Sequence, residues 1–149
     1  MRARLVLLTL AAAILMVALA ASGCSSTETA SPDGAATTTA AYQTVDVQTA
    51  NDALSSNADA QLLDVREPSE WAETGVVRGA VLVPLGEVES RASAGLAKDQ
   101  PVYVMCRTGH RSRIASETLV GLGYTQVYNV DGGITAWLDA GLPVEAYTP

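Results

Sequence analysis

The sequence of 149 residues predicts an α/β fold, in which helices flank both faces of a central parallel sheet of about five strands. Short apolar runs alternate along the chain with amphipathic stretches of helical length. The runs are too continuously apolar to leave one face in water, as is typical of strands that are buried on both sides. We expect one folded domain, because a chain of this length has little left over for a second hydrophobic core.

The expected elements follow one another from residue 42 onward. Strands are expected at the apolar runs, the first of which is the weakest: residues 42–46, 61–65 (QLLDV), 81–83 (VLV), 102–105 (VYVM) and 127–130 (VYNV). Helices are expected at the amphipathic stretches: residues 48–55, 69–73, 87–94, 111–122 and 132–140. In the fourth helix, Ala115, Leu119 and Leu122 form a core-facing stripe. Gly121 and Gly123 supply its end.

Residues 1–23 have the features of a signal peptide, because two arginines precede an apolar run over residues 5–21. Small residues then lead to Cys24, and this stretch resembles the lipobox of bacterial lipoproteins, with alanine in place of the usual leucine. The resemblance implies a lipid on Cys24 and a domain held at the cell membrane on its extracytoplasmic side. The alternative is an uncleaved membrane anchor, for which the apolar run is at the short limit.

Residues 24–41 are expected to form a flexible tether. They are dominated by Ser, Thr and Ala and offer no large apolar side chain that would offset the entropy of ordering. The folded domain is then expected over residues 42–149. A disulfide between Cys24 and Cys106, the two cysteines of the chain, is the weaker alternative, because it would join a flexible end to a loop of the domain.

The chain is acidic, with 9 Lys and Arg against 16 Asp and Glu and a net charge of −7. Nucleic acid is therefore not an expected partner, because affinity for a phosphate backbone comes from many basic contacts. Against this acidic background the segment CRTGHRS, residues 106–112, places a cysteine beside two arginines and a histidine. It lies between an expected strand and an expected helix, at the sheet edge where ligands of α/β proteins bind.

Cys106 is expected to be a reactive thiolate. The N-terminus of the following helix and the cationic side chains of Arg107, Arg111 and Arg113 all favour the ionised sulfur. The loop amides are expected to turn inward as an anion-binding nest, and Gly109 permits the positive φ that such a bend often needs. The alternative, an inert buried cysteine, leaves the surrounding arginines and glycine without a role.

The segment CRTGHRS resembles the active-site loop of rhodanese-domain sulfurtransferases, whose usual form is Cys-Arg-Ser/Thr-Gly-x-Arg-Ser. Further segments match this family in the right order: LLDVREPSEW (62–71), GAVLVPLGEV (79–88) and GYTQVYNVDGGITAWLDAGLPV (123–144). The resemblance covers the whole folded part and implies the rhodanese-like fold, with Cys106 carrying sulfane sulfur as a persulfide. It also implies a loop that cradles the outer sulfur and an anionic donor, formed by Arg107, Thr108, Gly109, His110, Arg111 and Ser112.

The activity that the resemblance implies is a sulfur transfer in two steps. The Cys106 thiolate attacks the outer sulfur of a small anionic donor such as thiosulfate, releases sulfite and becomes a persulfide. A thiol, or cyanide in vitro, then removes the sulfur. No cofactor is expected, and no metal, because the sequence has no His, Asp or Cys cluster with ligand spacing. A dithiol oxidoreductase would lack its resolving cysteine.

Two other functions remain open, a non-catalytic module whose loop binds an anion or a partner, and a cysteine phosphatase. The intact cysteine with its arginines disfavours the inert module. Related phosphatases have Cys-x5-Arg, because phosphate requires a wider ring of amides, whereas here Arg111 follows Cys106 at Cys-x4-Arg. Met105 also stands where phosphatases commonly have histidine. The spacing therefore favours sulfur over phosphate.

One segment departs from the family pattern. Where the family often has Gly-His-Ile-Pro-Gly-Ala, this chain has GVVRGA at residues 75–80, with Val76 in place of the histidine and Arg78 in place of the proline. The replaced histidine is not the nucleophile, so the departure bears on local packing and not on the expected chemistry. His110, at the variable position of the loop, is expected to face solvent.

Other residues are expected to have structural roles. Asp64 and Arg66 match the family's Asp-Val-Arg and are expected to brace loops through hydrogen bonds. Trp71 and Trp137 are expected to pack in the core or at its rim. Asp131 is expected to cap the last helix at its N-terminus.

Overall fold

The computed structural model of the chain describes residues 41–149. The expected signal peptide, the expected lipid-bearing Cys24 and the expected tether up to residue 40 lie outside the described residues. Residues 41–149 form a five-stranded sheet in the order β1-β5-β4-β2-β3, and every neighbouring pair is parallel. Within them, no helix combines the length and the apolarity that a membrane span requires. The α/β fold with a central parallel sheet is therefore confirmed.

All five expected strands are present, and the last two match the expected residues without any shift. The strands are β1 (Gln43–Val45), β2 (Gln61–Asp64), β3 (Val81–Leu82), β4 (Val102–Met105) and β5 (Val127–Val130). Successive side chains of the central strand β4 point to opposite faces, so that Tyr103 and Met105 join one apolar cluster and Val102 and Val104 the other. This double burial explains why the strands are apolar throughout.

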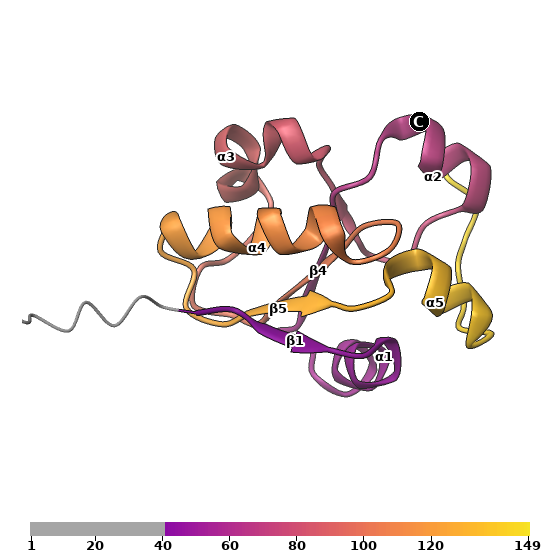
Figure 1. Cartoon of the computed structure of the whole chain (residues 1–149), viewed down its shortest axis with the longest axis horizontal. Coiled ribbons are helices and arrows are strands. Elements are labelled where there is room, and N and C mark those ends of the chain that lie inside the picture. The colour runs from indigo at the N-terminus through magenta and orange to yellow at the C-terminus, as the bar shows by residue number, and fades with distance from the viewer. Residues whose placement is uncertain (1–40) are drawn as a thin grey trace, which may run out of the picture. The chain divides into compact units, whose positions relative to one another are not determined.

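Helices cover both faces of the sheet (Figure 1). They are α1 (Val47–Ser56), α2 (Pro68–Thr74), α3 (Val88–Arg91), α4 (His110–Gly121) and α5 (Gly133–Asp139). The α3 and α4 helices pack on one face through Val88, Ala115 and Leu119. The α1 and α5 helices pack on the other face, where Trp137 is buried, as expected. Figure 1 shows α3 and α4 together on one side of the sheet and α1 on the opposite side.

The helix expected over residues 87–94 is wrong in its extent. The structure has a 3₁₀ turn at Leu85–Glu87, the single α-turn of α3, and a second 3₁₀ turn at Ala92–Ala94. The two side chains that this segment buries, Val88 and Ala92, are one helical turn apart. Gly86 and Gly95 flank the segment and disfavour a longer helix. One turn of α-helix is therefore all that packing stabilises here.

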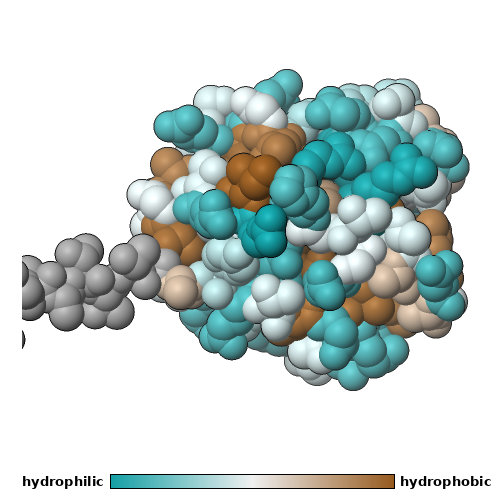
Figure 2. Space-filling view, in the orientation of Figure 1, coloured by the Kyte–Doolittle hydropathy of each residue, from teal (hydrophilic) through white to brown (hydrophobic). Residues whose placement is uncertain are grey.

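The surface of the described residues mixes polar and apolar side chains. On the face drawn in Figure 2, hydrophobic residues form separate groups among hydrophilic ones. Ile114 and Leu138 are large apolar side chains that stay exposed in the part of the chain that the structure describes. Most large apolar side chains lie in the two clusters on either side of the sheet. Cys106, which follows the end of β4, is still part of one of these clusters.

Candidate active site

A short loop joins β4 to α4 and begins with Cys106. Cys106 directly follows Met105, the last residue of β4, and α4 begins at His110. Gly109 is the N-cap of α4 and has a φ of 99°, so the expected positive φ at this glycine is confirmed. Few other residues adopt this conformation without strain. The turn at Gly109 brings its backbone amide back toward the sulfur of Cys106.

The sulfur of Cys106 is held by hydrogen-bond donors. Its Sγ atom accepts from the Gly109 amide at 3.1 Å and from the Ser112 hydroxyl at 3.5 Å. Burial raises the pKa of this thiol, but hydrogen bonds from the Ser112 hydroxyl and from the amides of Ser112, Thr108 and Gly109 outweigh burial, so that the pKa lies below its ordinary value. Cys106 is therefore a buried thiol whose surroundings favour the thiolate.

The arginines contribute differently from the sequence-based expectation. Arg111 forms a two-pronged ion pair with Glu70 of α2, with Nη1 2.7 Å from Oε2 and Nη2 2.7 Å from Oε1. Glu70 is the main cause of a raised pKa of Arg111, and the charge of Cys106 adds to it. Arg107 and Arg113 are exposed. Hydrogen bonds to Sγ, and not the charges of the three arginines, are thus what lowers the pKa of Cys106.

Glu70→Gln is expected to lower the free energy of unfolding by about 2 kcal/mol at pH 7, because it breaks a charge-assisted pair. The hydrogen bond from Arg111 is the main cause that lowers the pKa of Glu70 to about 2, against the opposing effect of burial. A carboxyl whose pKa is lower in the folded protein stabilises it above the pKa of the unfolded chain, and this contribution disappears as the pH falls toward 2. Urea unfolding from pH 7 to pH 2 measures it.

The matched control for this prediction is Glu73→Gln, because Glu73 lies on the same helix with an exposed side chain. The wild type and the Glu70→Gln variant should converge in stability between about pH 4.5 and pH 2. The Glu73→Gln variant should follow the wild type throughout. A difference between wild type and Glu70→Gln that stays constant over this range would contradict the ion pair.

The N-terminus of α5 holds the outer side of the loop. The Ile134 amide donates to the Cys106 carbonyl at 2.8 Å, and the amide and hydroxyl of Thr135 donate to the Arg107 carbonyl at 3.1 and 3.0 Å. The loop carbonyls are thus directed toward α5, which leaves the loop amides free to face Sγ. This is the nest of amides expected from the sequence. The role of α5 was not expected.

The expectation that Asp131 caps α5 is wrong. The N-cap is Gly132, and both Gly132 and Gly133 have a positive φ, of 73° and 55°. Two left-handed residues in succession turn the chain sharply enough to bring Gly133 against the Cys106 carbonyl, where a side chain would collide. Asp131 lies before this turn, with its Oδ1 atom beside Gly109. The two glycines therefore position the helix end against the loop.

Asp64 and Arg66 brace the segment that carries Glu70, as expected from the sequence. The buried guanidinium of Arg66 donates to both carboxylate oxygens of Asp64, with distances of 2.6 to 3.0 Å. It also donates to the Thr74 hydroxyl at 2.6 Å and to the Gly75 carbonyl at 2.9 Å, at the end of α2. This network fixes α2 beside β2, and α2 in turn holds Glu70 against Arg111.

Two cavities flank the loop that Cys106 begins. One, of about 130 Å³, lies between α2 and α5 and includes Arg107 in its wall. The other, of about 360 Å³, lies on the side of Thr108, Gly109 and His110. The side chain of His110 is exposed, as expected, and its Nδ1 lies 3.3 Å from the guanidinium of Arg113. A small molecule therefore has room on either side of the loop.

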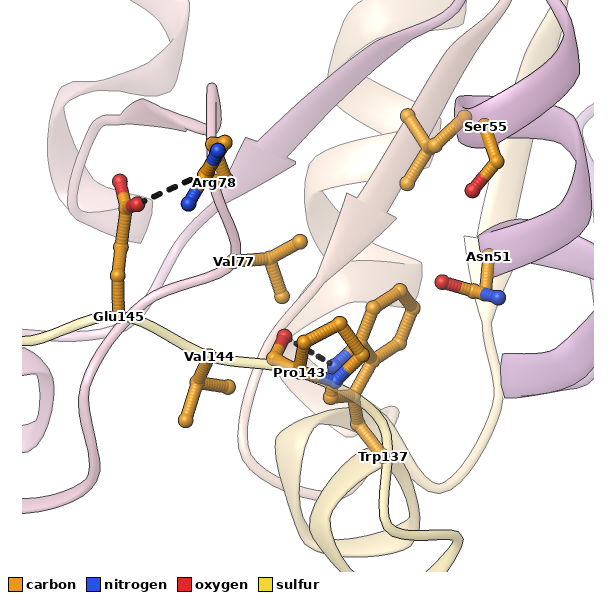
Figure 3. A pocket seen from close by; sticks show the side chains of 9 residues that line it. Asn51, Ser55, Val77, Arg78, Trp137, Pro143, Val144 and Glu145 are labelled. Atoms are coloured by element: carbon orange, nitrogen blue, oxygen red, sulfur yellow. Dashed lines mark hydrogen bonds and ion pairs between the residues drawn. The ribbon is translucent and has the colours of Figure 1, made fainter.

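The departure from the family pattern lies away from this loop. The backbones of Val76 and Glu145 exchange two hydrogen bonds, of 2.9 and 2.8 Å, and the exposed Arg78 pairs with the Glu145 carboxylate at 3.2 Å. Both Arg78 and Glu145 border a cavity of about 410 Å³ beside Trp137, which Figure 3 shows. None of residues 106–112 lines this cavity. Val76 and Arg78 thus contact the C-terminal segment, and the hydrogen bonds and ion pair of these two residues do not reach the loop of Cys106.

Comparison with known proteins gives consistent matches. Residues 46–140 match the family described as rhodanese-like domain. A sulfurtransferase of Allochromatium vinosum is 36% identical over 102 residues, which are 68% of this chain and 94% of that protein. The thiosulfate sulfurtransferase GlpE of Vibrio cholerae serotype O1 is 37% identical over 102 residues, which are 68% of this chain and 93% of that protein.

Solved structures give the same result for the fold. The polysulfide-sulfur transferase of Wolinella succinogenes matches with a TM-score of 0.63 and 32% sequence identity, over 72% of this chain and 80% of that one. The family match spans most of the described residues and includes the loop of Cys106, the Glu70–Arg111 pair and the two glycines at the N-terminus of α5. By fold, by sequence and by these matches, the chain belongs to the rhodanese-like domain family, whose members similar to it include sulfurtransferases.

Proposed function

We propose that the protein is a sulfurtransferase that carries sulfane sulfur as a persulfide on Cys106. The observation that carries this proposal is the pair of donors on a buried sulfur, the Gly109 amide at 3.1 Å and the Ser112 hydroxyl at 3.5 Å. Donors fixed in a site with little water stabilise an anionic sulfur both before and after a second sulfur atom is attached. Similarity to proteins named sulfurtransferase supports the same reaction.

The proposed reaction has two displacement steps. The Cys106 thiolate attacks the outer sulfur of a small anionic donor such as thiosulfate, and the donor's sulfur–sulfur bond breaks with its electron pair leaving on sulfite. The new bond makes Cys106 a persulfide. A thiolate acceptor, or cyanide in vitro, then attacks the outer sulfur of the persulfide. The bond between this sulfur and the Cys106 Sγ atom breaks, and its electron pair stays on Sγ and restores the thiolate. The exposed Arg107 and Arg113 would attract the anionic donor to the loop.

The test is to incubate the full chain with thiosulfate and to measure its intact mass before and after cyanide is added. We expect the protein to gain one sulfur atom, and cyanide to remove it while thiocyanate forms. The same protein is offered a phosphate ester in parallel. An unchanged mass together with no thiocyanate would contradict the proposal and leave a binding module, and release of phosphate would point to a phosphatase.

We also propose, from the sequence alone, that a lipid on Cys24 holds the domain at the cell membrane on its extracytoplasmic side, where the acceptor would be a thiol. The basis is the signal peptide-like residues 1–23 followed by the lipobox-like stretch. Expression of the full chain in a bacterium, followed by mass analysis of the peptide that begins at Cys24, tests this. A soluble chain that retains residues 1–23 would contradict it.

A further inference from the structure

Asn129 is a buried polar residue whose side chain lies next to the sulfur site. It belongs to β5 and is paired in register with Val104 of β4, two residues before Cys106. Its Oδ1 atom accepts a hydrogen bond of 2.7 Å from the Ser112 hydroxyl. The same hydroxyl lies 3.1 Å from the Gly109 carbonyl and 3.5 Å from the Cys106 sulfur. Three acceptors thus surround one hydroxyl.

A serine hydroxyl has a single hydrogen, so it donates to one of these acceptors at a time. The shortest contact is the one to Asn129, and it draws the hydrogen away from the sulfur. Deleting this acceptor would leave the Gly109 carbonyl and Sγ as the remaining acceptors, so that the hydroxyl would donate to Sγ more often. The geometry makes Asn129 a competitor of Cys106 for the Ser112 hydrogen.

We propose that Asn129 is a positioning residue that sets, through the direction of the Ser112 hydroxyl, how strongly the Cys106 sulfur is stabilised as an anion. When the sulfur is a neutral thiol, the hydroxyl donates to Asn129. When the thiol loses its proton to a base in solution, the hydroxyl rotates about its own C–O bond and donates to Sγ instead. Ser112 keeps its hydrogen throughout, so that no further proton is transferred. This inference rests on the proposed use of Cys106 as the sulfur carrier.

The hydroxyl direction is a local property that can be changed without touching the charges near Cys106. The charged and titratable side chains around the loop come from every element packed against it and are those of Asp64, Arg66, Glu70, Arg107, His110, Arg111, Arg113 and Asp131. Substitutions at Asn129 leave all of these side chains in place. A change in the ionisation of Cys106 that follows Asn129→Leu therefore reports on the hydroxyl.

The experiment measures the rate at which iodoacetamide alkylates Cys106 in the full chain from pH 5 to pH 10. Alkylation is quantified on the peptide that contains Cys106, so that Cys24 does not contribute. Asn129→Leu removes the competing acceptor, and we expect the midpoint of the profile to fall by about half a pH unit, or about threefold more thiolate below the midpoint. Asn129→Asp keeps the acceptor and adds a negative charge, and we expect the midpoint to rise by about one pH unit.

Ser112→Ala provides the matched background. Without the hydroxyl, Asn129→Leu should no longer move the midpoint, because the two residues act through one hydrogen bond. The inference is overturned if, with Ser112 present, Asn129→Leu leaves the midpoint unchanged or raises it. It is also overturned if Asn129→Leu lowers the midpoint equally in both backgrounds. Thermal unfolding verifies that each variant is folded. Should Asn129→Leu not fold, Asn129→Ala, which also removes the acceptor without adding a charge, takes its place in both backgrounds, and the same outcomes overturn the inference.

The alkylation profile uses no sulfur donor, so it is independent of the sulfur-transfer assay. Failure to form a persulfide, together with the expected shifts in the profile, would remove the proposed function and leave the control of the thiol intact. Normal persulfide formation with no shift in the profile would remove the role of Asn129 alone. The two proposals therefore fail in distinguishable ways.

Discussion

Cys106→Ser is expected to lower the rate of thiocyanate formation from thiosulfate and cyanide by roughly 10³-fold or more, the scale on which removal of a covalent nucleophile acts. The serine hydroxyl is nearly neutral at pH 7 and cannot form a persulfide, although its oxygen would still receive the hydrogen bonds that reach Sγ. The assay is the release of thiocyanate under saturating thiosulfate, together with the intact mass after incubation with thiosulfate alone.

The matched control is Cys24→Ser, because Cys24 is the other cysteine of the chain and lies outside residues 46–140, which match the family. This variant should add one sulfur atom as the wild type does and should form thiocyanate at the same rate. Equal rates from wild type and Cys106→Ser would refute Cys106 as the carrier. Loss of activity in Cys24→Ser would show that a second thiol takes part.

Gly133→Ala is expected to destabilise the protein by about 3 kcal/mol and to remove most of the sulfur transfer. Gly133 has a φ of 55°, which costs alanine strain, and a Cβ at this position would collide with the Cys106 carbonyl oxygen and lie 2.7 Å from the Arg107 carbonyl. The helix end has to move away, which breaks the bond from the Ile134 amide to the Cys106 carbonyl. Urea unfolding and thiocyanate release measure the two effects.

Gly141→Ala is the matched control for this second prediction. Gly141 has a similar φ of 68°, but a Cβ there would meet no atom within 4 Å. Its expected cost is the backbone strain alone, about 1 kcal/mol, with sulfur transfer unchanged. The difference between the two variants therefore isolates the collision with the loop. If both alanines were tolerated equally, the contact between α5 and the loop would have no role in holding it.

The strands and the loop of Cys106 were predictable because their causes are local in the sequence. The strand at residues 102–105 is a continuous apolar run, and its burial on both faces leaves few alternatives. Gly109 is the residue that accommodates a φ of 99° at the start of α4. The cysteine, the glycine and the serine that bonds the sulfur are all within seven residues. Sequence reasoning therefore located the cysteine that we propose as the nucleophile and the loop whose amides face it, although it did not predict the Ser112 hydroxyl as a donor.

The partners of the loop were not predictable because the fold alone brings them close. Glu70 lies 41 residues before Arg111, and Asn129 lies 17 residues after Ser112. Nothing near Arg111 in the sequence indicates that its guanidinium forms an ion pair with a carboxylate of another helix. The predicted extent of the helix over residues 87–94 was wrong for a related reason, because the length of a helix depends on how much of it packs against the sheet. Contacts between residues distant in sequence therefore determined both the partners of the loop and the length of this helix.

The strand order also bears on how the polypeptide reaches its native state during synthesis. β1 leaves the ribosome first, yet it lies at the sheet edge and pairs with β5, which leaves it last among the strands. The α5 residues that hold the carbonyls of Cys106 and Arg107 follow later still. A nascent chain that stops before β5 contains the cysteine but has neither a complete sheet nor the α5 amides that bind the loop carbonyls. The thiol consequently acquires its reactive environment only after translation of the domain is nearly complete.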